Sequence, residues 1–184
     1  GGIEGVKRRL ENKSVEVRVA ALRDALNYGD AGLDLVIEAL DDDSWQIRNA
    51  AVRLLRNSNK PKGKLAWLTY LLKIDSYNID VYNERGLVRQ KLADFQGAIA
   101  DFSRAIELDD EYADAYLNRG ICWQELGDYQ KAKNNYLYLL LNNDSAIAYY
   151  RCGFCSHELK QYKLALEYYS NAIEIAPTYS HSYM

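Results

Sequence analysis

Apolar and small residues recur in the second half of the chain with a helical spacing and a long period. Three stretches share a tyrosine, a glycine four residues later and an alanine twelve residues after the glycine, at intervals of 34 and then 33 residues. In the middle copy Tyr116, Gly120 and Trp123 mark one face of a helix, and Ala132 and Tyr136 mark a face of the next. A Gly-Asp pair interrupts the pattern between them, as a tight turn requires. The pattern therefore predicts a repeated helix–turn–helix unit.

The glycine of each copy predicts close packing between the two helices of a unit. A lone glycine inside a helix is tolerated at a cost of about 1 kcal/mol. Recurrence at Gly86, Gly120 and Gly153 indicates instead that a side chain has no room there. Units with a period near 34 cannot bury their apolar face alone, so they stack on their neighbours and form an extended surface.

These residues resemble the tetratricopeptide repeat over about 100 residues, because the same offsets recur three times. Arg89 and Ser156 depart from the usual second aromatic of the first helix, and only the third copy ends in proline, at Pro177. The resemblance implies an all-α, right-handed α-solenoid with three repeats and the start of a fourth in residues 78–184. It also implies a non-catalytic scaffold that binds other proteins.

A different period of thirty residues runs through residues 1–77. Ser14, Val17-Arg18 and Ala20-Ala21 return as the following residues: Ser44, Ile47-Arg48 and Ala50-Ala51. Ser14 and Ser44 precede apolar stretches, where a hydroxyl can cap a helix. The pattern is similar to the short HEAT repeats of phycobilisome lyases. That resemblance implies that Arg18 and Arg48 bond acidic residues of a neighbouring repeat, which is a structural role.

Charge and composition narrow the classes of function. Residues 1–77 carry a net charge of +2 and residues 78–184 a net charge of −5, so neither half has the basic stripe of a nucleic-acid-binding protein. No apolar run reaches the roughly 20 residues that span a bilayer. The chain begins with Gly1-Gly2 rather than methionine, so we expect it to be a piece of a longer gene product.

Three features could suggest chemistry, and each has a simpler interpretation. Cys152 and Cys155 form a C-x-x-C inside a predicted repeat helix, without the strand of a redox motif or further zinc ligands. Asp41-Asp42-Asp43 precedes a helix start, where negative charge is favourable. Two histidines without a nucleophile–base pattern make hydrolysis a poor interpretation. We therefore expect no enzyme activity, metal or cofactor, and three cysteines favour the reducing cytoplasm.

The side of each first helix that lies away from the tyrosine–glycine stripe predicts a partner-binding groove. In tetratricopeptide repeats this side lines the concave face, and the residues follow at i, i+4 and i+7. Apolar centres flanked by amides suit a peptide with apolar anchors, among which Tyr150 and Phe154 should face out of the packed stripe. Asn118 and Arg151 match two of five positions of the chaperone-binding carboxylate clamp. The complete predicted set is Asn83, Leu87, Gln90, Leu117, Asn118, Ile121, Gln124, Tyr150, Arg151, Phe154 and His157.

The last full helix predicts a second surface. Leu166, Tyr169 and Ile173 fall at i, i+3 and i+7, on the face that a following repeat would cover. We expect further repeats or end-to-end self-association there, because exposed apolar patches tend to find partners. Other interpretations stay open: a bilin lyase subunit or other HEAT-repeat enzyme complex, a DNA-binding protein similar to alkylpurine glycosylases, and a structural spacer. The partner itself is not predicted.

Overall fold

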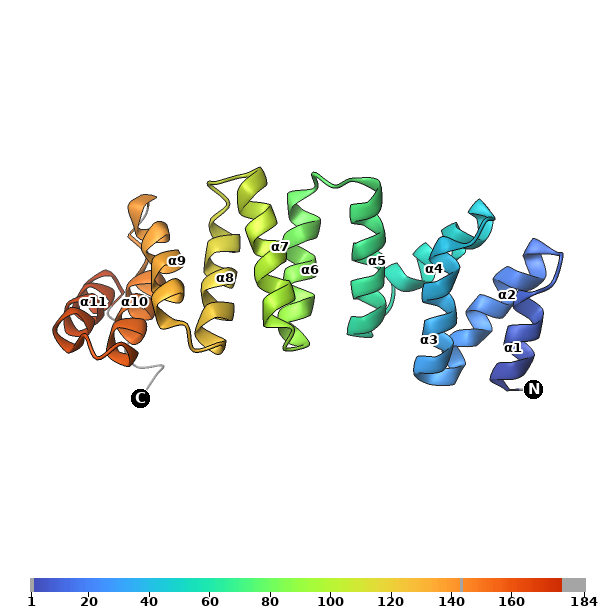
Figure 1. Cartoon of the computed structure of the whole chain (residues 1–184), viewed down its shortest axis with the longest axis horizontal. Coiled ribbons are helices and arrows are strands. Elements are labelled where there is room, and N and C mark those ends of the chain that lie inside the picture. The colour runs from blue at the N-terminus through green and yellow to red at the C-terminus, as the bar shows by residue number, and fades with distance from the viewer. Residues whose placement is uncertain (1, 143, 177–184) are drawn as a thin grey trace. The chain divides into compact units, whose positions relative to one another are not determined.

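The computed structural model describes residues 2–142 and 144–176, and every regular element in those residues is a helix (Figure 1). The all-α fold predicted from the sequence is therefore confirmed. The chain divides into two compact units, residues 1–76 and 77–184.

The N-terminal unit is built from two helical hairpins and one further helix. Its core consists of buried aliphatic side chains from all four hairpin helices, among them Val6, Leu22, Val36 and Leu55. Two short 3-10 turns, at residues 26–28 and 39–41, lengthen the second and third helices. The helices are α1 (Ile3–Leu10), α2 (Val15–Ala25), α3 (Gly29–Glu38), α4 (Trp45–Arg56) and α5 (Pro61–Ile74).

The two predicted serine caps differ. Ser14 accepts a hydrogen bond from the backbone N–H of Val17 through its hydroxyl, as predicted for α2. Ser44 stands at the same position before α4, but its hydroxyl makes no cap and donates to Gln46 Oε1 at 2.8 Å. The prediction of a hydroxyl cap at Ser44 is therefore wrong. The donation to Gln46 does not account for the difference, since Ser14 also donates, to Glu16 at 2.6 Å, and still accepts the cap bond.

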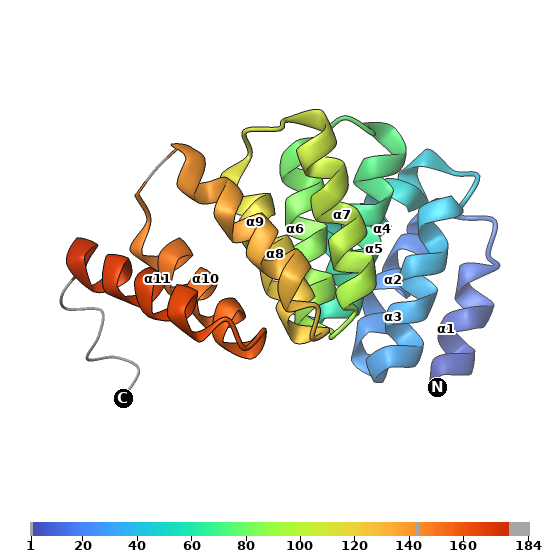
Figure 2. The same cartoon turned by 60° about the vertical axis from the view of Figure 1, so that its left-hand side comes forward.

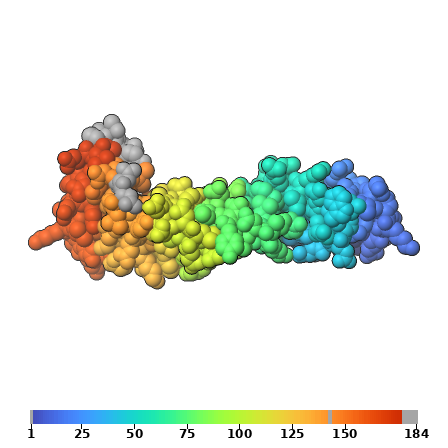
Figure 3. Space-filling view, turned by 90° about the horizontal axis from the view of Figure 1, so that it is seen from above, coloured from blue at the N-terminus to red at the C-terminus, as the bar shows by residue number. Residues whose placement is uncertain are grey.

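The described residues of the C-terminal unit form three successive antiparallel hairpins (Figure 2). The second helix of each hairpin also packs on the first helix of the next, so α7 contacts α8 and α9 contacts α10. The space-filling view shows these hairpins in direct contact (Figure 3). The pairs are α6 (Ile79–Lys91) with α7 (Phe95–Leu108), α8 (Ala113–Glu125) with α9 (Tyr129–Asn142), and α10 (Ala146–Glu158) with α11 (Tyr162–Ile175).

The recurring glycines lie where the two helices of each hairpin meet. A Cβ atom at Gly120 would lie 2.5 Å from Cε1 of Tyr136, the aromatic residue of the facing helix. Gly86 has the same relation to Phe102, at 2.6 Å. A Cβ atom added at Gly153 would lie 2.7 Å from the ring of Tyr169. The close packing predicted from the repeat is confirmed, since any larger side chain would displace an aromatic ring.

The turn between the two helices uses one backbone conformation in all three hairpins. Gly127 has a φ of 77°, and the equivalent residues Ala93 and Lys160 have φ values of 58° and 59°. Side chains with a Cβ atom strain this left-handed conformation by about 1–2 kcal/mol. Only the second hairpin therefore has the residue that the turn favours.

Candidate functional site

Polar side chains join the three first helices of the C-terminal unit on the predicted groove face. Asn118 on α8 donates from Nδ2 to Oδ1 of Asn83 on α6 at 3.3 Å. Gln124, also on α8, accepts at Oε1 from Nη1 of Arg151 on α10 at 3.4 Å and from the hydroxyl of Tyr136 at 3.2 Å. Predicted groove residues of adjacent repeats are thus neighbours in space.

Arg151 stands out among these residues because its charge is not neutralised. Its guanidinium lies 5.7 Å from the centre of the Tyr136 ring, and its buried Nε has no hydrogen-bond partner. Within the part of the chain that the structure describes, no carboxylate pairs with Arg151. A half-buried cation whose contacts are a neutral amide and an aromatic ring favours an approaching anion.

The apolar members of the predicted groove are partly engaged inside the unit. Leu87, Leu117 and Phe154 pack against the core clusters, and Phe154 meets the Tyr129 ring edge to face at 6.1 Å. Tyr150 lies 5.7 Å from Tyr169, measured between ring centres. The aromatic side chains therefore do not simply face out of the packed stripe, as the sequence had suggested.

The remaining groove residues are accessible to different degrees. Gln90 and Ile121 are half-buried, whereas His157 is exposed and has Nδ1 at 3.1 Å from a carboxylate oxygen of Glu158. Peptide binding to this face stays a prediction.

Only part of the predicted self-association face on α11 is exposed to solvent. Leu166 and Ile173 are 68% and 51% exposed. Tyr169, in contrast, is half-buried against Gly153 within its own repeat. Self-association through this face therefore stays a prediction, with Leu166 and Ile173 as its accessible residues.

The three cysteines are buried free thiols on repeat helices. Burial raises the pKa of Cys152 to about 12 and the pKa values of Cys122 and Cys155 to about 11. A nucleophilic or metal-binding cysteine requires the thiolate, which is scarce at neutral pH when the pKa is this high. Across residues 2–142 and 144–176 no group of three His, Cys, Asp or Glu residues is arranged to hold a metal.

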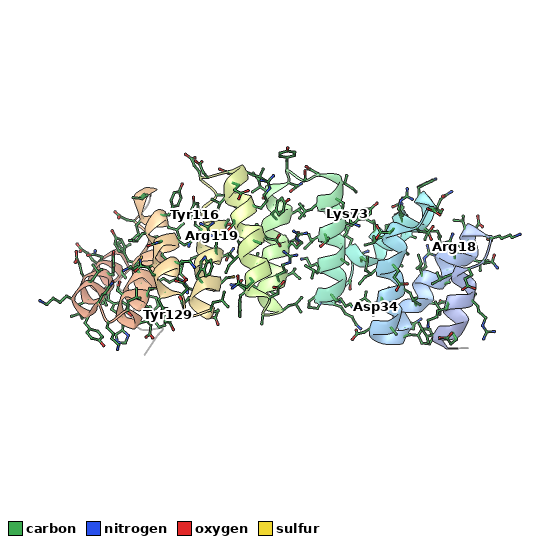
Figure 4. All side chains as sticks on the ribbon, in the orientation of Figure 1. Arg18, Asp34, Lys73, Tyr116, Arg119 and Tyr129 are labelled. Carbon is green, nitrogen blue, oxygen red and sulfur yellow. The ribbon has the colours of Figure 1, made fainter. Side chains whose placement is uncertain are left out.

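The acidic run before α4 joins neighbouring helices of the N-terminal unit. Asp42 forms an ion pair with Arg18 of α2, and its Oδ1 accepts from the backbone N–H of Ser44. Arg48 donates to the backbone carbonyls of Asp42 and Asp43 at 2.6 and 2.8 Å. Arg18 and Lys73, the latter paired with Asp41, are labelled in Figure 4. Arg18 thus bonds an acidic residue of the neighbouring repeat, as the HEAT resemblance implied. Arg48 does not: it bonds backbone carbonyls just before its own helix, which is a structural role of another kind.

A buried ion cluster between α6 and α7 was not predicted from the sequence. Asp101, which is 2% exposed, accepts from Nη2 of Arg85 at 2.6 Å and from Nη1 of Arg89 at 2.8 Å. The sequence did contain a sign of this cluster. Arg89 stands where the repeat pattern has an aromatic residue, and Asp101 directly precedes Phe102, the aromatic residue that follows the repeat alanine by four positions. The pairing explains why an arginine can stand at an otherwise apolar position.

Comparison with known families and structures identifies the repeats of the C-terminal unit. Residues 83–132 and 146–179 match models of the Tetratricopeptide repeat family. These segments are tetratricopeptide repeats. Such repeats are generally non-enzymatic interaction modules, and no catalytic family is indicated. Both matches lie after residue 82, so the HEAT-like character of residues 1–77 and its boundary at residue 78 stay predictions.

Several solved structures share the fold. A crystal structure of MamA has a TM-score of 0.64 at 19% identity, covering 92% of this chain and 99% of that one. The structure of YrrB, a tetratricopeptide protein with an unusual peptide-binding site, gives 0.63 at 20% identity over 96% and 95%. MamA residues 41 to the end, from Desulfovibrio magneticus RS-1, give 0.62 at 21% identity over 71% and 73%. At these identities the likeness concerns the fold.

No curated protein matches the sequence. Of the described helices, none has the length and apolar character needed to cross a membrane.

Proposed function

We propose that this chain is a non-catalytic interaction scaffold that binds a peptide segment of another protein on the groove face of α6, α8 and α10. The fold supports this proposal, since stacked helix pairs offer an extended surface and the described residues form no metal site. Buried free thiols suit a reducing compartment, and we place the scaffold in the cytoplasm on that ground.

The charge of Arg151 is the observation that carries the proposal. Its guanidinium is half-buried, Nη1 makes a long contact of 3.4 Å to Oε1 of Gln124, and Nε has no hydrogen-bond partner. A carboxylate on the bound segment would replace that long contact to a neutral amide with a short ion pair, in which the guanidinium can donate two parallel hydrogen bonds. We therefore expect the partner segment to carry an acidic residue that lies next to Arg151.

Amide side chains supply the rest of the recognition. Asn83, Asn118 and Gln124 each offer two N–H donors and a carbonyl acceptor. The contact between Asn118 and Asn83 uses one donor and one acceptor, so further capacity remains for the backbone of a bound peptide. Sequence-tolerant backbone contacts beside one charged anchor would hold an extended segment in register.

The same face argues against recognition of a free chain terminus by a two-carboxylate clamp. Leu87 and Ile147 stand at two positions where that clamp has an amide and a lysine. Leu87 packs against the core of the first repeat rather than presenting a polar group. The groove face therefore suits one acidic side chain inside a peptide. It suits a chain terminus less well, because the clamp residues that would bind a terminal carboxylate are replaced by Leu87 and Ile147.

Peptide display against the whole chain tests the proposal. We expect selected peptides to share an acidic residue and to bind Arg151→Gln at least about tenfold more weakly, a loss of about 1.4 kcal/mol. Lys163→Gln, an exposed neutralisation on α11, is the matched control and should bind normally. Selected peptides without an acidic preference, or with equal affinity for both variants, would refute the proposed groove.

A further inference from the structure

A polar hollow lies where α7, α8 and α9 meet, on the other side of α8 from the groove. Its volume is about 240 Å³, and it is lined by Ser103, Arg119, Trp123, Lys131, Asn134 and Asn135. Arg119 follows the groove residue Leu117 by two positions, which is a rotation of about 200° around the helix. Figure 4 labels Arg119 together with Tyr116 on α8. The hollow is thus separate from the groove face.

The equivalent place in the first repeat is closed by an ion cluster. Positions 85, 89 and 101 there correspond to 119, 123 and 135 in the second repeat, at the interval of 34 residues. Arg85 and Arg89 both bind the carboxylate of Asp101. In the second repeat Trp123 replaces the second arginine, and the neutral Asn135 replaces the aspartate.

This replacement leaves Arg119 without a counter-charge. Nε of Arg119 donates to Oδ1 of Asn135 at 2.8 Å, and Nη1 donates to the hydroxyl of Ser103 at 3.1 Å. Among the described residues it has no carboxylate partner, and burial lowers the pKa of its guanidinium. Both partners are neutral, so the charge is hydrogen-bonded but not neutralised.

The remaining lining residues favour an anion as well. Lys131 holds its ammonium 4.2 Å above the Trp123 ring and pairs with Asp128, which does not line the hollow. Asn134 and Asn135 add amide groups, although the Nδ2 of Asn135 is used by the carbonyl of Lys131 at 2.8 Å. No acidic side chain lines the hollow. Compared with the first repeat, the arrangement lacks one carboxylate.

We propose that this hollow binds a carboxylate, supplied by an aspartate or glutamate side chain of a protein that docks on the side of α8 opposite the groove. The incoming carboxylate would take the role of Asp101 in the first repeat and accept hydrogen bonds from Arg119. Trp123 and Lys131 would flank it, and the aromatic ring with a nearby cation is typical of an interaction hot spot. The proposal does not depend on peptide binding in the groove.

Nuclear magnetic resonance of the whole chain tests this site with three probes. The probes are sodium acetate, the peptide acetyl-Ala-Ala-Glu-Ala-Ala-amide and the same peptide with glutamine in place of glutamate. Each titration is monitored by the chemical shifts of the Nε–H of Arg119 and the indole N–H of Trp123. We expect saturable shifts with acetate and the glutamate peptide, and none with the glutamine peptide. If acetate shifts these signals and the glutamate peptide does not, the ligand is not a protein side chain and the proposal is wrong. If neither probe shifts them, there is no anion site in the hollow. Inorganic phosphate bound at least tenfold more tightly than acetate would overturn the carboxylate assignment.

Asn135→Asp is the decisive variant, because it supplies the missing carboxylate from within the chain. It should weaken binding of both carboxylate probes at least about tenfold, the ratio expected when an internal partner competes for Arg119. Arg119→Gln removes the cation and should abolish the shift at Trp123, which keeps the test valid if the first variant folds poorly. Arg151→Gln in the groove should leave these titrations unchanged. Unaltered probe binding by Asn135→Asp would refute the proposal.

Discussion

In the first tetratricopeptide repeat Asp101 lies between Arg85 and Arg89, whereas in the second repeat Asn135 faces Arg119 alone. The helix-to-helix packing around these residues is otherwise the same, with a glycine against an aromatic ring in both repeats. Two replacements, Trp123 for Arg89 and Asn135 for Asp101, thus separate a closed structural ion cluster from a hollow with an uncompensated cation. The comparison is the basis of the proposal that one repeat position stabilises the first repeat and takes part in recognition in the second.

The same distinction separates other arginines of the chain. Arg18 of the N-terminal unit is paired with Asp42 and has a structural role. Arg151 of the third repeat, like Arg119, has no carboxylate partner within the described residues. Arg18 is therefore structural, whereas Arg119 and Arg151 are the two arginines on which the binding proposals rest.

The largest expected effect comes from removing the carboxylate of the first repeat. Asp101→Asn would leave two arginines around a buried neutral amide, and we expect a loss of about 3–5 kcal/mol in the local free energy of unfolding. Hydrogen exchange of peptides from α6 and α7 measures this locally, which matters in a chain with two units.

Asp110→Asn, an exposed change outside the cluster, is the control and should leave exchange almost unaltered. Equal exchange in Asp101→Asn and Asp110→Asn would mean that the ion cluster contributes nothing to the first repeat. The contrast drawn between the two repeats would then be lost.

A methyl group added at the repeat glycine should destabilise the first and second repeats alike, because in both the glycine packs against an aromatic ring. Gly120→Ala places a Cβ atom 2.5 Å from the Tyr136 ring and should destabilise the second repeat by about 1–3 kcal/mol through overpacking. Gly86→Ala should do the same to the first repeat. Gly5→Ala in α1, where a Cβ atom meets nothing within 4 Å, should instead stabilise by up to about 1 kcal/mol. Chemical denaturation checks these signs, and a stabilising Gly120→Ala would contradict the close approach.

The turns give a smaller difference between the repeats. Ala93 adopts a left-handed conformation that Gly127 adopts in the second repeat without strain. Ala93→Gly should therefore stabilise the first repeat by about 1 kcal/mol, and Gly127→Ala should destabilise the second by a similar amount. Protection from hydrogen exchange in α6–α7 and α8–α9 should change in opposite directions. Movement in the same direction would show that turn strain does not govern these hairpins.

Thiol reactivity should show the least difference between repeats. Cys122 and Cys155 have pKa values raised from 9.0 to about 11 by burial, so the folded protein holds about a hundredfold less thiolate than free cysteine well below pH 9. Alkylation at pH 8, followed by mass spectrometry, should be correspondingly slow and should accelerate as the pH rises toward 11. Rapid labelling of Cys155 alone would revive a special role for the C-x-x-C.

Much of the fold could be predicted from the sequence, because helix packing in a repeat depends on local spacing. The offsets from Gly120 to Ala132 and Tyr136 determine which side chains meet, and the structure brings these residues together. The hydroxyl cap at Ser44 was not predictable in the same way. Ser14 and Ser44 stand at equivalent positions and both donate to the side chain two residues on, yet only Ser14 accepts the cap bond, so sequence spacing does not distinguish them.

The candidate sites were less predictable for a related reason. The groove positions followed from the helical period, but the partial packing of Tyr150 and Phe154 depends on rings from the second helices. The hollow around Arg119 becomes visible only when the partner of each arginine is known. A comparison of positions 101 and 135 would have signalled the missing charge, and the three-dimensional contacts are the basis on which a site is proposed there.

The central claim is that Arg151, a half-buried cation without a carboxylate partner among the described residues, receives an acidic residue of the partner, and a charge swap tests it most directly. Calorimetry would compare Arg151→Glu, a selected peptide with its acidic residue changed to lysine, and the two changes combined. Each single change should weaken binding at least about tenfold, and the combination should recover it, with a coupling energy of about 1.5 kcal/mol or more. Simple addition of the two losses would contradict the claim.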